Sequence, residues 1–300
     1  MDQEIRAFAL SYDRFMRLVG RMSATAPAAT QAFLARWMGR LLSPYRQRAA
    51  AMSSAMGQAL MLDAEETRRF WYDWLENHGL FALSTYHFRT LNTGWLSSRI
   101  TVENSELLSL LKIQGGLVMT YHCHHQNLIA ARIGIACGNM TALAASANSS
   151  PLYPYLGPHI ERINCDSARW FGDGYYLFTD KRIELVRKTQ ARLSSGKVVL
   201  TLSDTPWPVR TNMPAGHIFG RQISPPTGAV AIAVRLGKPI VAAIMIPGSE
   251  GLTLRLRRLV SSADVAAVLS DYFFFLETTA RNFPACWQGW EWWHSLPARH

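Results

Sequence analysis

The chain has 300 residues, 49% of them hydrophobic, and a formal net charge of +10. This length and apolar content suit one large globular domain, or a catalytic domain with a helical appendage, and argue against a disordered chain. The positive charge favours acidic partners such as a phospholipid surface, a nucleic acid or an acidic carrier protein. The basic residues are scattered, however, and no recognition helix, aromatic sheet motif or zinc knuckle is present, so we expect no nucleic-acid partner.

The four cysteines show neither a close pair nor the spacing of metal ligands, which predicts structural thiols in a reducing compartment. They are Cys123, Cys137, Cys165 and Cys286. No cleavable signal peptide is recognised, and no apolar run reaches the roughly 20 residues needed to cross a bilayer. The sequence therefore predicts a soluble or peripheral protein.

Residues 1–95 are expected to form a helical N-terminal region packed on the core, and residues 96–300 an α/β domain. Asp63 and Glu66 form a capping-box pattern before an apolar helical stretch. The predicted helix over 32–42 presents an apolar stripe that would usually belong to the core. Because this helix combines Phe33 and Trp37 with two arginines, it could instead lie on a membrane surface.

From about residue 98 onward, short apolar strands alternate with helices. The expected strands cover residues 99–102, 117–121, 140–145, 198–202 and 240–246. The expected helices cover residues 106–112, 128–138, 181–193, 229–236 and 262–282. This order predicts an α/β fold in which helices flank a mixed, largely buried sheet.

The stretch 204–216 contains three prolines and has no periodicity, which is typical of a loop that lines a site. Several aromatic and apolar residues could line a pocket for an alkyl chain or could equally be core. They are Met119, Tyr121, Tyr153, Tyr155, Trp170, Phe171 and Trp207.

His122 follows an apolar strand in the segment GGLVMTYHCHHQNL, at the corner before a predicted helix. Open α/β sheets usually place their sites at such strand ends. A general base needs a partner on its second ring nitrogen, and Asn127, one helical turn into the next element, is placed to reach back. His124 and His125 suggest zinc, but adjacent histidines point in different directions and no further ligand set is evident, so we expect no metal site.

The motif VMTYHCHHQNL, with four residues between His122 and Asn127, resembles the histidine-x4-acid signature of the glycerolipid acyltransferase superfamily, and specifically of its lipid A late acyltransferase branch. LSSGKVVLTLSDTPW resembles the strand of that branch that ends in an aspartate before a site loop. IFGRQISPPTGAVAIAVRLGKPIVAAIMIP resembles its turn, Thr-Gly helix start and closing strand, and RNFPACWQGWEWW resembles its aromatic tail. The resemblance covers about residues 46–295.

The resemblance implies transfer of an acyl chain from a thioester of acyl carrier protein or coenzyme A to a hydroxyl or amine acceptor, with no cofactor. His122 would take the proton of the acceptor, and Asp204 matches the aspartate after the strand. Arg221, Thr227 and Gly228 match the segment that shapes the wall of the acceptor or acyl site. Helix capping by the Thr-Gly pair and a surface ion pair of the arginine are the structural alternatives.

His125, Tyr121 and Trp207 complete the expected set of substrate contacts. The implied location is cytoplasmic, with peripheral contact to the inner membrane as a further expectation. The chain departs from the family pattern in two ways. The first is the lack of the N-terminal membrane helix, which favours a small-molecule acceptor over a bilayer-embedded lipid A precursor.

The second departure is Asn127 itself, which replaces the family acid. An amide can accept a hydrogen bond from His122 but cannot offset the charge that develops on the imidazole, and in serine proteases the corresponding change lowers turnover by about ten-thousandfold. Three explanations stay open. Another acid, Asp204 or Asp166, supplies the charge; the acceptor is a better nucleophile such as an amine; or the chain only binds an acyl chain or a carrier protein.

Overall fold

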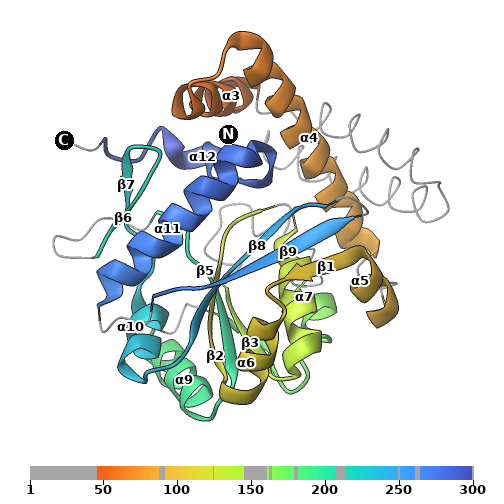
Figure 1. The fold of residues 1–300 in the computed structure, drawn as a ribbon, viewed down its shortest axis with the longest axis vertical. Helices are drawn as coiled ribbons and strands as arrows, with labels where there is room; N and C mark the ends of the chain where they lie inside the picture. Colours follow the sequence, from red (N-terminus) through yellow and green to blue (C-terminus); the bar gives the residue numbers. More distant parts are fainter. Residues whose placement is uncertain are drawn as a thin grey trace, which may run out of the picture.

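The central feature of the computed structural model is a seven-stranded sheet with the order β1-β9-β8-β2-β5-β3-β4 (Figure 1). The structure describes residues 46–87, 92–123, 125–144, 161, 164–178, 182–206, 214–248, 251–260 and 264–298. The strands of this sheet are β1 (Ile100–Glu103), β2 (Gly116–Thr120), β3 (Met140–Ala144), β4 (Tyr176–Phe178), β5 (Val198–Leu202), β8 (Ile240–Pro247) and β9 (Leu252–Arg258).

The sheet is mixed because its two strands at one edge, β1 and β9, run opposite to the other five. Strands β8, β2, β5, β3 and β4 run parallel to one another, whereas β9 is antiparallel to β8 and parallel to β1. A separate antiparallel hairpin joins β6 (Gly216–Ile218) to β7 (Arg221–Ile223). The predicted α/β class with a mixed central sheet is therefore confirmed.

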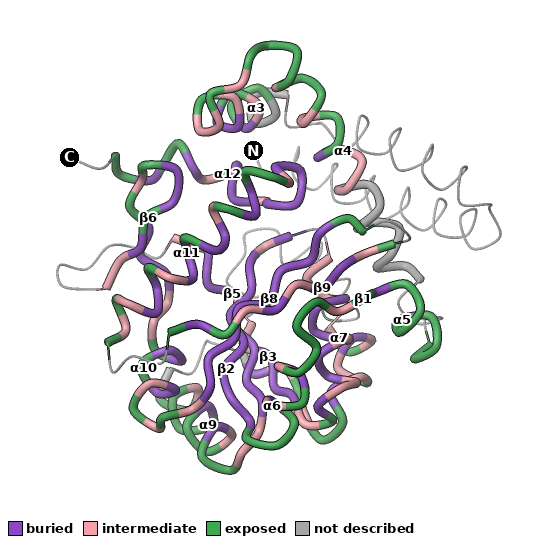
Figure 2. The backbone as a smooth tube through the Cα atoms, viewed as in Figure 1, coloured by how far each residue is buried: buried purple, intermediate pink, exposed green. Residues whose placement is uncertain are grey.

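Helices cover both faces of the sheet (Figure 1). On one face lie α9 (Arg182–Ser194), α10 (Gly228–Arg235) and α11 (Val265–Asn282), which pack beside one another. On the other lie α5 (Thr93–Arg99), α6 (Glu106–Gln114) and α7 (Gln126–Cys137). The central strands are accordingly buried, as the continuous purple tube in Figure 2 shows, and every residue of β2 is buried. Burial on both faces explains why these strands read as apolar runs and not as alternating patterns.

The described N-terminal residues form α3 (Arg46–Leu60) and α4 (Ala64–His87), which lie at one end of the molecule (Figure 1). The predicted capping box is present, since Oδ1 of Asp63 accepts from the backbone N–H groups of Glu65 and Glu66, both at 2.8 Å. The predicted helix over 32–42 lies outside the described residues. The expected boundary at residue 95 falls within α5. None of the helices in the described ranges is both long and apolar enough to cross a bilayer.

The C-terminal segment, residues 283–298, closes the fold against these N-terminal helices. It contains the 3-10 helix η2 (Pro284–Cys286) and the short α12 (Trp290–Trp293). The indole N–H of Trp74 in α4 donates to the carbonyl of Trp287 at 3.0 Å, and Asn77 donates to the carbonyl of Ala285 at 3.3 Å. Because η2 and α12 contact α4 and α3, and the backbone N–H of Gln288 donates to the carbonyl of His122 just past β2 at 2.9 Å, this segment lies between these helices and the carboxyl ends of the parallel strands (Figure 1).

Candidate active site

The pairing of β2 with β5 places His122 beside Asp204. Thr120 is opposite Leu202 in the parallel register. His122 comes two positions after Thr120, and Asp204 comes two positions after Leu202. The ladder continues past the strands, because the backbone N–H of Ser203 donates to the carbonyl of Thr120 at 2.8 Å. The imidazole and the carboxylate thus meet at the carboxyl edge of two neighbouring strands, where open α/β sheets carry their sites.

One oxygen of Asp204 holds both the backbone and the ring of His122. Oδ1 accepts from the backbone N–H of His122 at 2.9 Å and lies 2.7 Å from ring Nδ1. A buried carboxylate that meets several N–H groups acts as an acceptor, so the hydrogen sits on Nδ1 and leaves Nε2 free to accept one. Oγ1 of Thr205 lies 3.1 Å from the same Nδ1 and can share that hydrogen as a second acceptor.

The second oxygen of Asp204 is bound from the C-terminal segment. The indole N–H of Trp287 donates to Oδ2 at 3.0 Å, and the backbone N–H of Gln288 donates to the carbonyl of His122 at 2.9 Å. Asp204 is fully buried, whereas 26% of the His122 side chain is exposed. The arrangement therefore combines a shielded, fully hydrogen-bonded acid with a base whose ring reaches the surface.

Opposing effects act on the protonation of His122. Burial lowers its pKa, but the charge of Asp204, the hydrogen bond to Asp204 and the charge of Glu291 together raise the pKa above its ordinary value. The ring also meets Trp292 edge to face, with centroids 5.6 Å apart and an interplanar angle of 87°. An imidazole with a raised pKa and an open face is suited to take a proton and to return it.

The thiols near the site are unsuited to nucleophilic catalysis. Burial raises the pKa of Cys286 to about 12 and that of Cys123 well above its usual range. Only the thiolate is a strong nucleophile, so neither sulfur is reactive near neutral pH. The chemistry of the described site is therefore that of a base.

The pairing expected between His122 and Asn127 is not found. Of the acids considered, Asp204 supplies the carboxylate, and among the described residues no hydrogen bond joins Asn127 to His122. The physical reason is that α7 begins at Gln126 and not at the histidine, so five positions along the chain do not amount to one helical turn.

The structure places one of the expected substrate contacts, Tyr121, in the core and another, His125, beside the site. Tyr121 is 1% exposed and its hydroxyl donates to the carbonyl of Met245 at 2.7 Å, so it belongs to the core. His125 precedes α7 and is partly buried, and burial lowers its pKa to about 4. Its Nδ1 is buried without a hydrogen-bond partner among the described residues. His125 is therefore a neutral imidazole beside the site at physiological pH. Of the other proposed lining residues, Met119 and Phe171 are fully buried core residues.

Arg221 holds the C-terminal segment and makes no surface ion pair in the described part of the chain. Its Nη1 donates to the carbonyl of Leu296 at 2.6 Å, and its guanidinium lies 4.2 Å from the ring centroid of Trp293. Thr227 occupies the expected start of α10 but makes no side-chain capping bond, and Gly228 is exposed. No hydrogen bond of the described residues connects any of these three to His122. Trp207, Tyr153 and Tyr155 lie outside the described residues.

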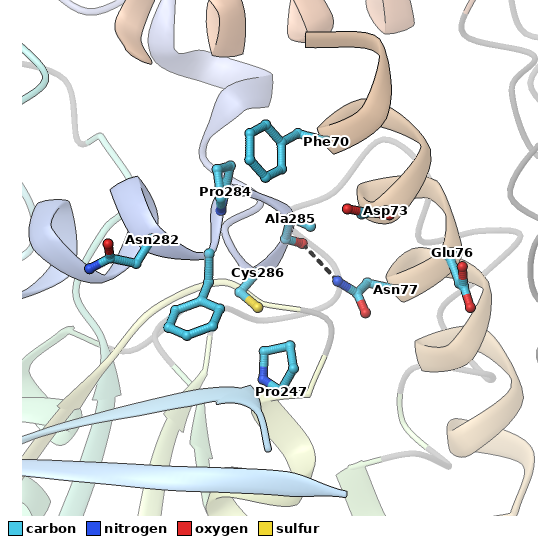
Figure 3. Close-up of a pocket in the computed structure, with 10 residues that line it drawn as sticks. Phe70, Asp73, Glu76, Asn77, Pro247, Asn282, Pro284, Ala285 and Cys286 are labelled. Carbon is cyan, nitrogen blue, oxygen red and sulfur yellow. Dashed lines mark hydrogen bonds between the residues drawn. The ribbon is translucent and has the colours of Figure 1, made fainter. Parts of the chain in front are cut away.

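A pocket of about 250 Å³ lies at the same edge of the sheet, between α4, the end of β8 and the C-terminal segment (Figure 3). Its lining residues are Phe70, Asp73, Glu76, Asn77, Pro247, Asn282, Phe283, Pro284, Ala285 and Cys286. Neither His122 nor Asp204 lines this pocket. Sequence reasoning did not find it, because it is formed by segments far apart in the chain.

Residues that sequence reasoning missed are Thr205, Trp287 and Trp292. A tryptophan in an aromatic tail carries no local signal that its N–H faces an acid 83 positions earlier. In the ranges that the structure covers, no cluster of three or more His, Cys, Asp or Glu side chains is placed to hold a metal ion. Comparison of the sequence with protein-family models and with curated proteins found no match.

Proposed function

We propose that the protein is an acyltransferase in which His122 acts as the general base on a hydroxyl or amine acceptor. The observation that carries this proposal is the 2.7 Å contact between Nδ1 of His122 and Oδ1 of the buried Asp204. A carboxylate on one ring nitrogen fixes the tautomer and stabilises the imidazolium that forms when the other nitrogen takes a proton. The motif resemblance to the lipid A late acyltransferase branch supports the reaction class.

In the proposed reaction His122 takes one proton from the acceptor and later gives it to the leaving thiolate. Nε2 of His122 takes the proton of the acceptor while the acceptor oxygen or nitrogen bonds to the carbonyl carbon of the thioester. The tetrahedral oxyanion then collapses, the carbon–sulfur bond breaks, and Nε2–H returns the proton to the departing thiolate. Asp204 keeps its hydrogen bond to Nδ1 throughout and stabilises the positive ring between the two transfers. The residues return to their starting state and no cofactor is consumed.

The donors that suit this site are thioesters of an acyl carrier protein or of coenzyme A. Both donors are anionic, and the chain carries a net charge of +10. Opposite net charges raise the rate of encounter, and this effect falls with ionic strength. A cytoplasmic location with peripheral membrane contact belongs to the same proposal.

The alternative of a non-catalytic binding protein depended on Asn127 leaving the base without a carboxylate. Asp204 meets His122 at 2.7 Å, so the lack of an acid at position 127 gives no reason to expect an inactive site. The acyltransferase proposal is therefore the better supported of the two.

The test is an acyl-transfer assay with carrier-bound and coenzyme A thioesters against panels of hydroxyl and amine acceptors. Release of the free thiol gives the rate, and mass spectrometry identifies the acylated acceptor. We expect His122→Gln, which keeps hydrogen-bonding groups but cannot take a proton, to lower kcat by about 10²- to 10⁴-fold. His217→Gln is the matched control, because His217 is exposed on β6. Unchanged turnover in His122→Gln would refute the proposal.

A further inference from the structure

We infer that Trp287 is a positioning residue for the base, an inference that rests on the proposed function. The hydrogen bond from its indole N–H to Oδ2 leaves Oδ1 of Asp204 to bind His122. The terminal torsion of an aspartate is broad, so the two hydrogen bonds that His122 makes to Oδ1 alone do not fix the plane of the carboxylate. A donor on each side does fix it, and the plane of the carboxylate sets the direction in which the imidazole is held.

Trp287 is itself held rigidly by three parts of the fold. Its carbonyl accepts from the indole of Trp74 in α4 at 3.0 Å. Its ring, which is fully buried, lies 5.7 Å from the ring of Phe219, and it meets Trp290 of α12 edge to face at 4.7 Å. Helix α4 therefore holds the backbone of Trp287, and the turn between β6 and β7 together with α12 holds its indole. Because the indole is buried and held on several sides, it is better suited to orient Asp204 than to contact a substrate.

Gly289 supplies the space that this indole occupies. A Cβ at Gly289 would lie 2.0 Å from Cε2 and Cζ2 of Trp287 and 2.5 Å from its Nε1. The backbone of Gly289 has φ −61° and ψ −9°, which any residue adopts, so the glycine is needed for its lack of a side chain and not for conformational freedom. The tail sequence W-Q-G thus encodes both the donor and the room for it.

The inference predicts that loss of the indole N–H slows the chemical step and changes how the imidazole of His122 is held. Replacing the indole with a phenyl ring removes the N–H and leaves Oδ2 of Asp204 buried without that donor. Residues that orient the ligands of a metal typically contribute about 10- to 100-fold to affinity or activity, and we expect an effect of that size for a residue that orients the acid of a base. We expect Trp287→Phe to lower kcat by about that factor with little change in KM, because the residue does not reach the substrate.

The experiment compares Trp287→Phe and Gly289→Ala with the control Trp293→Phe in the full chain. Trp293 is also a buried tryptophan of the C-terminal segment, but its indole N–H has no hydrogen-bond partner among the described residues. Nitrogen NMR of labelled histidine reports whether the hydrogen sits on Nδ1 or Nε2 of His122, and single-turnover acyl transfer reports the chemical step. Gly289→Ala keeps every hydrogen-bonding side chain but forces the indole of Trp287 to move, so it tests the same hydrogen bond without deleting the N–H.

We expect the two test variants to change the nitrogen signals of the His122 ring, because the ring is no longer held in one direction, and to lose kcat, and we expect the control to resemble the wild type. Unchanged His122 signals in a folded Trp287→Phe, or equal losses in Trp287→Phe and Trp293→Phe, would overturn the inference. The two proposals fail separately. If the wild type acylates no acceptor but the His122 signals still change in Trp287→Phe, the acyltransferase proposal is lost and the positioning role of Trp287 stands.

Discussion

Replacing Asp204 with asparagine removes the charge beside His122 and leaves the shape of the side chain almost unchanged. The two carboxylate oxygens face three N–H groups, from the backbone of His122, its ring and Trp287. An amide offers one acceptor oxygen and one donor NH2, so one side must meet a donor. Either the NH2 group faces the indole N–H of Trp287 across 3.0 Å, or it faces the backbone N–H of His122 across 2.9 Å.

Both orientations lower the expected activity. In the second, the NH2 group also faces Nδ1 of His122, so the ring hydrogen moves to Nε2, which can then accept no proton. In the first, the tautomer survives but the imidazolium loses its counter-charge. Two unit charges 2.7 Å apart attract by about 6 kcal/mol at an effective dielectric constant of about 20. Since about 5.4 kcal/mol corresponds to a ten-thousandfold change in rate, we expect Asp204→Asn to lower kcat by roughly 10³- to 10⁴-fold.

The assay is the pH dependence of kcat/KM, measured from thiol release with wild type and Asp204→Asn. The wild-type rate should fall as the pH drops through the pKa of His122, which is raised above 6.5, so the acid limb should lie above pH 6.5. In the variant the raising charge is gone and burial remains, so the residual activity should show an acid limb at lower pH. A variant within tenfold of wild type, or a wild-type acid limb below pH 6.5, would refute this reasoning.

Two further predictions concern neighbouring residues. Because Asn127 makes no hydrogen bond to His122 in the described site, Asn127→Ala should change kcat by less than about threefold, and a loss comparable to that of Asp204→Asn would contradict the assignment of the acid. Burial lowers the pKa of His125 from 6.5 to about 4, so the unfolded state takes up a proton in this interval while the folded state does not. Stability should therefore fall as the pH drops from 6.5 towards 4, by up to about 3 kcal/mol. Urea unfolding should show a flatter pH dependence in His125→Gln, and identical slopes would count against burial of a neutral ring.

The parallel strands β2, β3, β5 and β8 could be predicted because each is a short apolar run, whereas the three-residue β4 was missed. The run VVLTL was predicted at 198–202 and is β5, and the run beginning at Ile240 is β8. Strand β9 was missed because its sequence LTLRLRR inserts arginines where a buried strand is expected to be apolar. The structure satisfies those charges with partners that the local sequence does not reveal. Arg255 pairs with Glu103 of β1 at 2.6 Å, and Arg257 pairs with Asp271 of α11 at 2.5 Å.

The candidate site could be predicted only in part, because strand order is not a local property. The sequence placed His122 and Asp204 each after a strand, but only the neighbouring positions of β2 and β5 in the sheet bring them to 2.7 Å. The spacing rule that indicated Asn127 assumed a helix starting at the histidine, and α7 starts four residues later. The role of Trp287 required the packing of the whole C-terminal segment, which no periodicity encodes.

Because the carboxylate comes from Asp204, a different part of the fold sets the position of the acid relative to His122. In the signature that the motif resembles, the acid follows on the helix, so its placement would depend on the first turn of that helix. Here the same oxygen of Asp204 accepts from both the backbone and the ring of His122, so the pairing of two buried strands sets the distance between acid and base. Buried central strands are among the last parts of a fold to open, whereas helix ends fray. The geometry of this pair should therefore tolerate changes in the first turn of α7 and be sensitive to changes in the C-terminal segment, which binds the other oxygen.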